Sequence, residues 1–289
     1  MDFNRYQRAA AKTVQEAGEG QDPLLVPLLG LIGEVGSVTT AYKKRLRDGS
    51  AYELSKQHIR EELGDVLWYV AVLAAEFGLD FEDVAAASLE KVKDRWRPSE
   101  VDQLLLDQEA PAHEQLPRLA RFTFTPTLRG SDGRTVINLT WDGQPVGDPL
   151  TDASHLDDDY CFHDAFHLAY VAVLGWSPVM RSLLRRKRKS VPETDEAEDG
   201  GRAIAIEEGI SAMVFSYASR HGFFDGVRHV DNELLKTIGS MVAHLEVSVH
   251  RSADWEKAIM VGYECWRQLR EQKGGVLEVD MLQRTMRVL

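Results

Sequence analysis

The sequence predicts a mainly α-helical protein in which two helical regions are joined by a short β-rich segment. Helical periodicity covers residues 2–96, resumes at about residue 160 and continues nearly to the end. Residues 121–149 contain short β-rich runs separated by the turn signals SDG and DG, which predict a β-hairpin. We therefore expect a helical bundle over residues 1–108, a connector with the β-hairpin over 109–155, and a second, mostly helical domain over 156–289.

The N-terminal region is predicted to hold four helices separated by a few residues each. The first lies within residues 3–17, and the second begins after Asp22-Pro23, because Asp is a favoured N-cap and Pro is tolerated in the first turn. The second ends near residue 47, the third spans 52–78 and the fourth spans 80–96. Short connections between antiparallel helices predict a compact bundle.

The composition is that of a soluble globular protein, with 44% hydrophobic and 28% charged residues. No uninterrupted apolar run reaches the roughly 18–20 residues that span a bilayer, and the N-terminus MDFNRYQRAA lacks the apolar core of a signal peptide. We therefore expect a cytoplasmic protein without membrane contact. Cys161 and Cys265 provide neither a disulfide framework nor metal-knuckle spacing, which favours two ordinary buried thiols.

The net charge of −12 argues against charge-driven nucleic-acid binding, which needs a basic footprint. A site for a phosphate-bearing substrate would then need local cations or a bound metal. The basic run RRKRK at residues 185–189 stands apart from this background. It is either a solvated helix end balanced by the acidic ETDEAED that follows, or a local contact for phosphate or a polynucleotide.

Two carboxylates are predicted to lie beside the apolar face of the third helix. Residues three apart on a helix share a face, so Glu62 and Asp65 lie together with Glu61 at the edge of that face. Carboxylates beside a hydrophobic stripe are costly unless they are neutralised. Basic partners, protonation or a divalent cation could each neutralise them, and a plain solvated face is the alternative.

The second helix carries Glu34 and Ser37 on one face, in turns that also contain Gly30, Gly33 and Gly36. A glycine inside a helix costs roughly 1 kcal/mol relative to alanine. Three glycines therefore indicate a close backbone approach or a crowded ligand site. Oxygen ligands from two antiparallel helices suit a hard cation such as Mg²⁺.

The motifs GLIGEVGSV and EELGDVLWYV, in this order and spacing, resemble the MazG-like all-α nucleoside triphosphate pyrophosphohydrolases. The resemblance covers residues 3–96. The family pattern is Glu-x-x-Glu on one helix, Glu-x-x-Asp on the next, and a fourth helix bearing Lys or Arg. This chain departs from the pattern at Ser37, where the family has an acidic ligand, and at Ser88, where it has asparagine; Lys91 and Arg95 match its basic positions.

The resemblance implies hydrolysis of a nucleoside triphosphate to the monophosphate and pyrophosphate, with Mg²⁺ or Mn²⁺ as cofactor. Nucleotide-pool sanitation and nucleotide depletion during stress or defence are both compatible roles. The implied metal ligands are Glu34, Glu62 and Asp65, with Ser37 binding directly or through water. Glu61 and Glu62 are the implied catalytic carboxylates, and the implied phosphate contacts are Lys43, Lys44, Lys91 and Arg95.

Two further expectations concern the oligomeric state of the protein and the serine at position 37. An isolated bundle of this size rarely buries both faces of its helices, so we expect a homodimer or a higher homo-oligomer. The alternative is that the second half of the chain covers the bundle. Ser37 also supports a non-catalytic nucleotide-binding or assembly module as an alternative to the enzyme.

A second candidate site lies in the C-terminal region. His163 and His167 are spaced i, i+4 with Asp164 beside them, and a later helix supplies Glu207 and Glu208. Histidines at this spacing can bind a metal, or they can be satisfied by neighbouring acidic residues.

The adjacent His-Asp pair also resembles the HD-type metal phosphohydrolases. His155 and Asp231 are the candidates for the upstream His and downstream Asp of that family. The segment from YCFHDAFH to IEE resembles the extra C-terminal domain of some MazG-like proteins, which implies an architecture and no mechanism. The tail GGVLEVDMLQRTMRVL contains a strand-like run that could pair with the predicted hairpin.

Overall fold

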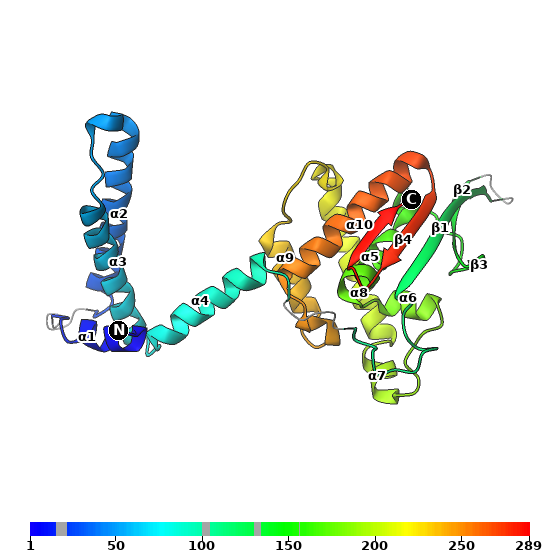
Figure 1. Cartoon of the computed structure of the whole chain (residues 1–289), viewed down its shortest axis with the longest axis horizontal. Helices are drawn as coiled ribbons and strands as arrows, with labels where there is room; N and C mark the ends of the chain where they lie inside the picture. Colours follow the sequence, from blue (N-terminus) through cyan, green and yellow to red (C-terminus); the bar gives the residue numbers. More distant parts are fainter. Residues whose placement is uncertain (16–21, 100–104, 130–133, 156) are drawn as a thin grey trace. The chain divides into compact units, whose positions relative to one another are not determined.

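The computed structural model describes residues 1–15, 22–99, 105–129, 134–155 and 157–289 (Figure 1). The chain forms two compact units, Met1–Val92 and Lys93–Leu289. Helices make up most of the regular structure, and the single sheet lies in the second unit. The predicted mainly α fold with an N-terminal helical bundle is confirmed.

The first unit contains the helices α1 (Phe3–Ala11), α2 (Leu25–Asp48) and α3 (Lys56–Glu76), and the start of α4 (Phe81–Trp96). A short 3₁₀ turn, η1 (Gly49–Ala51), follows α2. The Asp2 side chain accepts from Arg5 N at 2.7 Å and caps α1, and the Ser55 hydroxyl accepts from Gln57 N at 3.2 Å and caps α3. These caps satisfy amide groups that have no partner inside the helix, which is why the helices begin at these residues.

The core of the first unit is small: in the described residues, its apolar cluster has five buried members. The aromatic ring of Phe3 meets that of Phe81 edge to face at 5.2 Å between centroids. Gln7 donates to Leu79 O at 2.8 Å and accepts from Phe81 N at 3.2 Å, so α1 holds the turn between α3 and α4. The members of this cluster are Ala10, Ala71, Val72, Ala74 and Phe81, and Ala41 and Leu73 are buried outside it.

Helix α2 leaves much of its apolar surface exposed. Large side chains along its length point into solvent: Leu25, Leu28, Leu29, Ile32, Val35 and Leu46. By length and composition, one helix of the described chain, Leu25–Ala51, could cross a membrane; the mean hydropathy is 1.4 and 11% of the window is buried. Apolar helices of soluble proteins and signal sequences share these properties, so one such helix is weak evidence of a membrane span.

This finding differs from the expectation that no apolar run is long enough. Between residues 25 and 42, Glu34 is the single charged residue, while glycine, serine and threonine interrupt the run without making it strongly polar. A count of consecutive apolar residues misses such a segment, whereas the mean hydropathy detects it.

The second unit contains a five-stranded antiparallel sheet of order β3-β2-β1-β4-β5. The predicted hairpin is formed by β1 (Leu119–Leu128) and β2 (Thr135–Trp141), and its SDG turn lies outside the described residues. The predicted pairing of the tail is also confirmed, because β4 (Gly275–Asp280) pairs with β1 and then with β5 (Thr285–Val288). β3 (Gln144–Pro145) completes the other edge. Residues of the expected connector therefore lie within the second unit.

Helices cover this sheet and enclose the main core (Figure 1). Helix α5 (Asp164–Leu174) is buried at every position, and it packs against α10 (Ser252–Gln272) at Gly262. Three tryptophans, Trp176, Trp255 and Trp266, are fully buried. The other helices are α6 (Pro178–Leu183), α7 (Pro192–Ala197), α8 (Gly201–Ser219) and α9 (Asn232–Met241); the 3₁₀ turns are η2 (Tyr160–Phe162), η3 (Gly222–Phe224) and η4 (Glu246–Val249).

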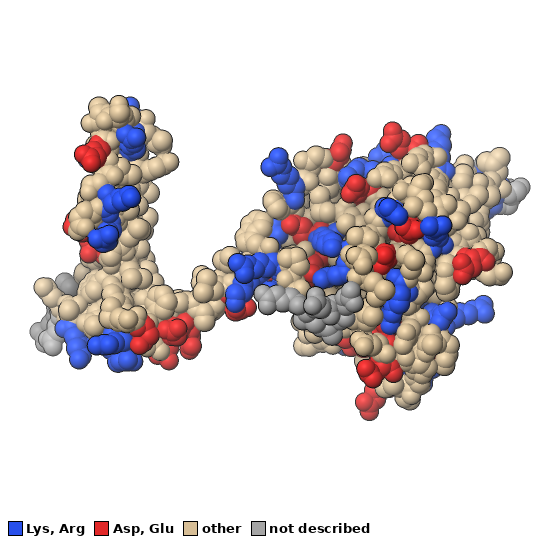
Figure 2. All heavy atoms as spheres, viewed as in Figure 1, with Lys and Arg blue, Asp and Glu red and all other residues tan. Residues whose placement is uncertain are grey.

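Part of the basic run at 185–189 is structural. The Arg188 guanidinium is buried and forms ion pairs with Asp199 at 2.7 Å and with Glu246 at 2.6 Å. Arg186 donates to Ala112 O at 3.0 Å. On the face of the second unit seen in Figure 2, basic and acidic side chains are interspersed. Arg188 is therefore a core ion pair, and neither a solvated helix end nor a phosphate contact.

The two cysteines are free thiols, as expected from their spacing. Cys265 is buried and Cys161 is half-buried. Burial raises the pKa of both thiols, which keeps them protonated and unreactive at neutral pH.

Candidate functional site

The carboxylates predicted on α3 lie on the side of the helix that is only partly covered. Glu62 is half-buried, with one oxygen 3.5 Å from His58 Nδ1, while its buried Oε2 has no hydrogen-bond partner. Glu61 is exposed, and its Oε1 accepts from Gln57 Nε2 at 2.6 Å. A buried carboxylate oxygen without a donor is unfavourable. Glu62 therefore has an unfilled position for a cation or a donor.

Asp65 is exposed and lies near α1. Burial raises the pKa of the Tyr6 hydroxyl, and the negative charge of Asp65 raises it further. The Asp65 carboxylate remains open to solvent.

Glu34 and Ser37 are half-buried on α2, which packs against α3. A Cβ added at Gly30 would collide with the ring of Tyr69, so glycine leaves room there for this ring to lie against α2. An added Cβ at Gly33 or Gly36 would meet nothing within 4 Å. The close-approach explanation therefore holds for Gly30, and open space surrounds the other two glycines.

Within one chain, the carboxylates of α2 and α3 do not meet as a closed metal cage. In the described part of the chain, the three metal-capable side chains that come together belong to the second unit. Glu34, Glu62 and Asp65 form no comparable group, so a metal held by them needs side-chain movement, substrate oxygens or a second chain.

The predicted phosphate contacts separate into two groups. Lys43 and Lys44 on α2 are exposed, as is Lys91 on α4. Lys44 Nζ lies 6.0 Å from the centre of the Tyr52 ring, so its charge is held loosely.

Arg95 belongs to the second unit and is engaged there. Its guanidinium forms an ion pair with Glu256 at 2.9 Å and donates to Val230 O at 2.9 Å. It also lies 4.3 Å from the centre of the Trp96 ring. In this structure Arg95 is thus committed to a structural contact, whereas the three lysines remain accessible.

The second candidate site is assembled at the start of α5. His163 and His167 lie on adjacent turns, with their rings 5.7 Å apart, and α8 brings Glu208 to them. One ligand atom of each of these three residues lies within 4.8 Å of the others. The structure therefore brings together residues that are more than 40 positions apart in sequence.

His167 is fully buried between two glutamates. Its Nδ1 lies 2.8 Å from Glu207 Oε1, and its Nε2 lies 3.6 Å from Glu208 Oε2. Burial lowers the pKa of the imidazole, but the two carboxylates outweigh it and raise the pKa of His167 to about 10. In the absence of another cation, a proton on His167 balances these acids.

Glu207 is fixed next to the site by several hydrogen bonds. Besides His167, it accepts from the Ser177 hydroxyl at 2.6 Å and from Val179 N at 2.8 Å. Ser177 is itself the N-cap of α6, with its hydroxyl accepting from Met180 N. The helix start therefore fixes the carboxylate that orients His167.

His163 is held by Tyr160 and lies beside Asp164. Its ring stacks on the Tyr160 ring at 4.5 Å, and its Nδ1 lies 2.9 Å from Tyr160 O. Asp164 is buried, with Oδ1 3.8 Å from His163 Nε2. Burial raises the pKa of Asp164 and lowers that of His163.

The upstream and downstream partners considered for an HD-type site lie elsewhere. Asp231 is the N-cap of α9, where its side chain accepts from Glu233 N at 2.9 Å. His155 lines a separate pocket. The group that the structure assembles thus consists of His163, His167 and Glu208, with neither of those two residues.

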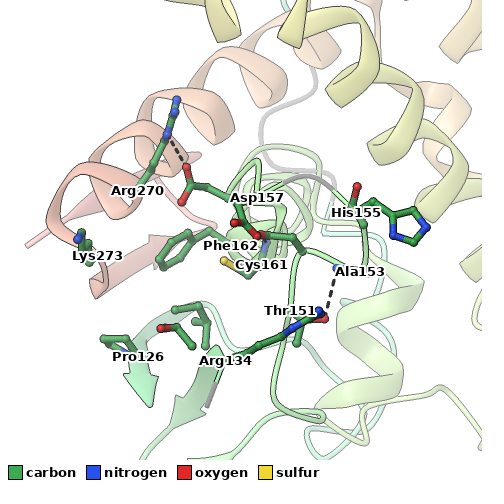
Figure 3. Close-up of a pocket in the computed structure, with 15 residues that line it drawn as sticks. Pro126, Arg134, Thr151, Ala153, His155, Asp157, Cys161, Phe162, Arg270 and Lys273 are labelled. Atoms are coloured by element: carbon green, nitrogen blue, oxygen red, sulfur yellow. Dashed lines mark hydrogen bonds and ion pairs between the residues drawn. The ribbon is translucent and has the colours of Figure 1, made fainter. Parts of the chain in front are cut away.

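That pocket of about 1070 Å³ was not predicted from the sequence (Figure 3). Figure 3 shows Arg134 and Arg270 on opposite sides of it, and Arg270 Nε forms an ion pair with Asp159 at 2.7 Å. Its lining comes from β1, β2, the segment before η2 and the end of α10. Residues drawn from such distant segments form no local motif, so no sequence pattern could have indicated the pocket.

Comparisons with known proteins divide the chain into the same two parts. Residues 25–98 match the model of the MazG nucleotide pyrophosphohydrolase domain, and residues 101–289 match that of the MazG C-terminal domain. The Gene 37 protein of Mycobacterium phage L5 is 35% identical over 101 residues, which cover 33% of this chain and 89% of the phage protein. No solved structure matches.

Proposed function

The chain belongs to the MazG family and carries its nucleotide pyrophosphohydrolase domain, and from this premise we propose that α2 and α3 hydrolyse a nucleoside triphosphate to the monophosphate and pyrophosphate. The observation that carries the proposal is the unpartnered, buried Oε2 of Glu62, which lies within the matched domain. A divalent cation would satisfy this oxygen, and oxygen ligands favour Mg²⁺ or Mn²⁺.

Each residue has a defined role in this proposal. Glu34, Glu62 and Asp65 hold the cation, and Ser37 contributes a hydroxyl in place of the usual carboxylate. The bound cation supplies charge neutralisation and a more acidic water. Glu61 is exposed beside Glu62, so it is placed to orient that water and accept its proton.

The accessible lysines would bind the triphosphate. Lys43, Lys44 and Lys91 each carry a mobile positive charge on the surface of the first unit. The protein has a net charge of −12, so these local charges are needed to offset the repulsion of an anionic substrate. Arg95 is left out of this set because Glu256 already holds it.

A second copy of the chain completes the first unit in this proposal. The exposed apolar side chains of α2 form a surface that the small core of the unit does not cover. Burying such a surface against an identical one stabilises a dimer, and large exposed apolar patches on soluble proteins mark such interfaces. Dimerisation would also bring a second set of carboxylates to the site. The resulting oligomer acts in the cytoplasm, without a membrane partner.

Product analysis tests the activity. With Mg²⁺ and a panel of canonical and modified nucleoside triphosphates, the protein is expected to release monophosphate and pyrophosphate. Glu62→Gln should lower turnover by at least about 100-fold, because it removes a metal ligand and a charge. Glu76→Gln, at the exposed end of the same helix, is the matched control and should keep the native rate. Equal rates for native protein and Glu62→Gln would refute the assignment. The preferred substrates would separate pool sanitation from nucleotide depletion.

Light scattering tests whether the protein forms a dimer or a larger oligomer. The native protein should have at least twice the 32.5 kDa mass of one chain. Ile32, which is 70% exposed on α2, would lie in the interface, so Ile32→Glu should shift the protein toward monomer. Val249→Glu, at an exposed position of the second unit, should not. A monomeric native protein, or one that enters lipid vesicles through α2, would overturn this part of the proposal.

Ser37 favours one alternative, a nucleotide-binding module without turnover. A hydroxyl in place of a carboxylate leaves the site with one negative charge fewer for its metal. Thermal stabilisation by nucleotide with no product release would support that alternative. Increased turnover in Ser37→Glu would show that the native site is an enzyme weakened at this position.

A further inference from the structure

We infer that His163, His167 and Glu208 form a binding site for a divalent transition-metal ion in the second unit. This site uses no residue of the α2 and α3 carboxylate group, and it does not depend on the activity proposed for that group. Its three ligands come from the start of α5 and the middle of α8.

Hydrogen bonding leaves the same nitrogen of both imidazoles available. The backbone carbonyl of Tyr160 can only accept, so His163 Nδ1 donates to it at 2.9 Å. In the same way His167 Nδ1 donates to the Glu207 carboxylate at 2.8 Å. Both rings can therefore present the lone pair of Nε2, which is the arrangement seen when a histidine binds a metal.

His167 Nε2 is a buried group that needs a partner. The side chain is 0% exposed, and this nitrogen has no hydrogen-bond partner. Glu208 Oε2 lies 3.6 Å from this nitrogen, too far for a hydrogen bond. Since the ring is locked by Glu207 on its other side, its free nitrogen is fixed in direction and points toward Glu208.

The surrounding residues position the ligands. Glu207 is fixed by Ser177 and Val179, so it cannot follow a movement of His167 and instead holds the ring in place. Tyr160 stacks flat on His163 and limits rotation of that ring. Carboxylates and carbonyls that bind the second nitrogen of a metal-bound histidine have this orienting role in known metal sites.

The donor set selects the class of metal. Two imidazoles and a carboxylate suit Zn²⁺, Mn²⁺ or Fe²⁺, whereas Mg²⁺ prefers oxygen alone. Zinc bonds of about 2.0–2.2 Å place neighbouring ligands about 3.4 Å apart, so the present group must contract slightly. The Glu208 side chain is 44% exposed and can make this movement.

The open side of the group gives the ion access to solvent. Glu208 lies at the surface, while His167 is enclosed. Three protein ligands and one solvent-facing position are typical of metal sites that bind water or a substrate oxygen, and purely structural zinc sites have four protein ligands.

Metal analysis of the full-length chain tests this inference. The protein is stripped with a chelator, and Zn²⁺ is added to the Glu62→Gln variant, so that the first unit contributes as little as possible. One Zn²⁺ per chain should remain bound after gel filtration. Glu208→Gln in this background should weaken binding by at least tenfold. Glu264→Gln, at an exposed glutamate of α10, is the matched control and should bind normally.

Two further measurements separate a metal site from a structural role of the same residues. Co²⁺ in place of Zn²⁺ should give visible absorption bands that depend on Glu208 and His163, which a purely structural change would not produce. Glu207→Gln should weaken binding about 10–100-fold, as expected for a residue that positions a ligand. If the Glu62→Gln chain retains no Zn²⁺ or Co²⁺, or if Glu208→Gln in this background binds as tightly as Glu264→Gln, a proton alone occupies His167 and the inference is wrong.

Discussion

The two units of this chain differ in how completely each buries its own apolar surface. Among the residues that the structure describes, the apolar core cluster of the first unit holds five buried residues, and the large side chains of α2 are exposed. The second unit buries every residue of α5 and three tryptophans around it. The exposed apolar surface of the first unit is why we propose that a second copy covers it, whereas the second unit buries a large core within one chain. A site built from exposed helices can accept ligands from another copy, whereas the histidine cluster is fixed by its own core.

Removing a core residue from each unit should have the largest effect on stability and tests this contrast directly. Trp266→Ala leaves a large cavity in the second unit and should lower its free energy of unfolding by about 3–5 kcal/mol. Phe81→Ala should destabilise the first unit alone. Chemical denaturation followed by tryptophan fluorescence and circular dichroism should show two separate transitions. If either variant shifts both transitions equally, the units do not unfold independently.

Two glycine substitutions on α2 should have smaller effects of opposite sign. Gly30→Ala places a Cβ against the Tyr69 ring and should destabilise the first unit by about 1–3 kcal/mol. Gly33→Ala meets nothing within one chain and should stabilise α2 by about 0.5–1 kcal/mol. Thermal unfolding measures both.

The Gly30→Ala and Gly33→Ala variants also test whether the first unit is covered by a second copy. If Gly33→Ala instead destabilises the protein or blocks oligomer formation, the open space beside Gly33 is filled by a second copy. If Gly30→Ala is harmless, the packing of α2 against α3 is looser than described.

Acid should affect the second unit through Asp254, with an effect on stability confined to low pH. Burial raises the pKa of this carboxyl, but His250, Ser99 and Arg284 outweigh burial and hold the pKa well below its usual range. A lowered pKa means that the stabilisation is present above about pH 4 and is lost as the pH falls through the folded-state value. Asp254→Asn should therefore flatten the acid dependence of stability by about 1–3 kcal/mol. Asp225→Asn, at an exposed position, should leave the pH curve unchanged.

Local signals predicted the parts of the molecule that depend on local structure. Asp22 accepts from Leu24 N at the turn before α2, and the β-rich runs pair as a hairpin. The spacing of His163 and His167 predicted their shared face, and the structure brings Glu208 to it. Each of these features needs only neighbouring residues or one helical face.

Features that depend on distant partners could not be predicted. Arg95 matched a basic position of the family, yet Glu256, far along the chain, engages it. Arg188 belongs to a charged run that suggested an exposed position, but it is buried and forms ion pairs with Asp199 and Glu246. No pattern at residue 95 or 188 carries information about those acidic partners, because tertiary packing alone decides which cation meets which acid.

The order of the sheet also has a consequence for how the protein is made. Strand β1 pairs with β4, and the pair of Arg121 and Glu278 joins residues 157 positions apart. The first unit ends at Val92, so during synthesis it can fold before the second unit has been translated. The second unit must wait until β4 is translated, and until then β1 exposes an unpaired edge. Chaperones and proteases therefore have their longest opportunity to act on this chain between the completion of β1 and the arrival of β4.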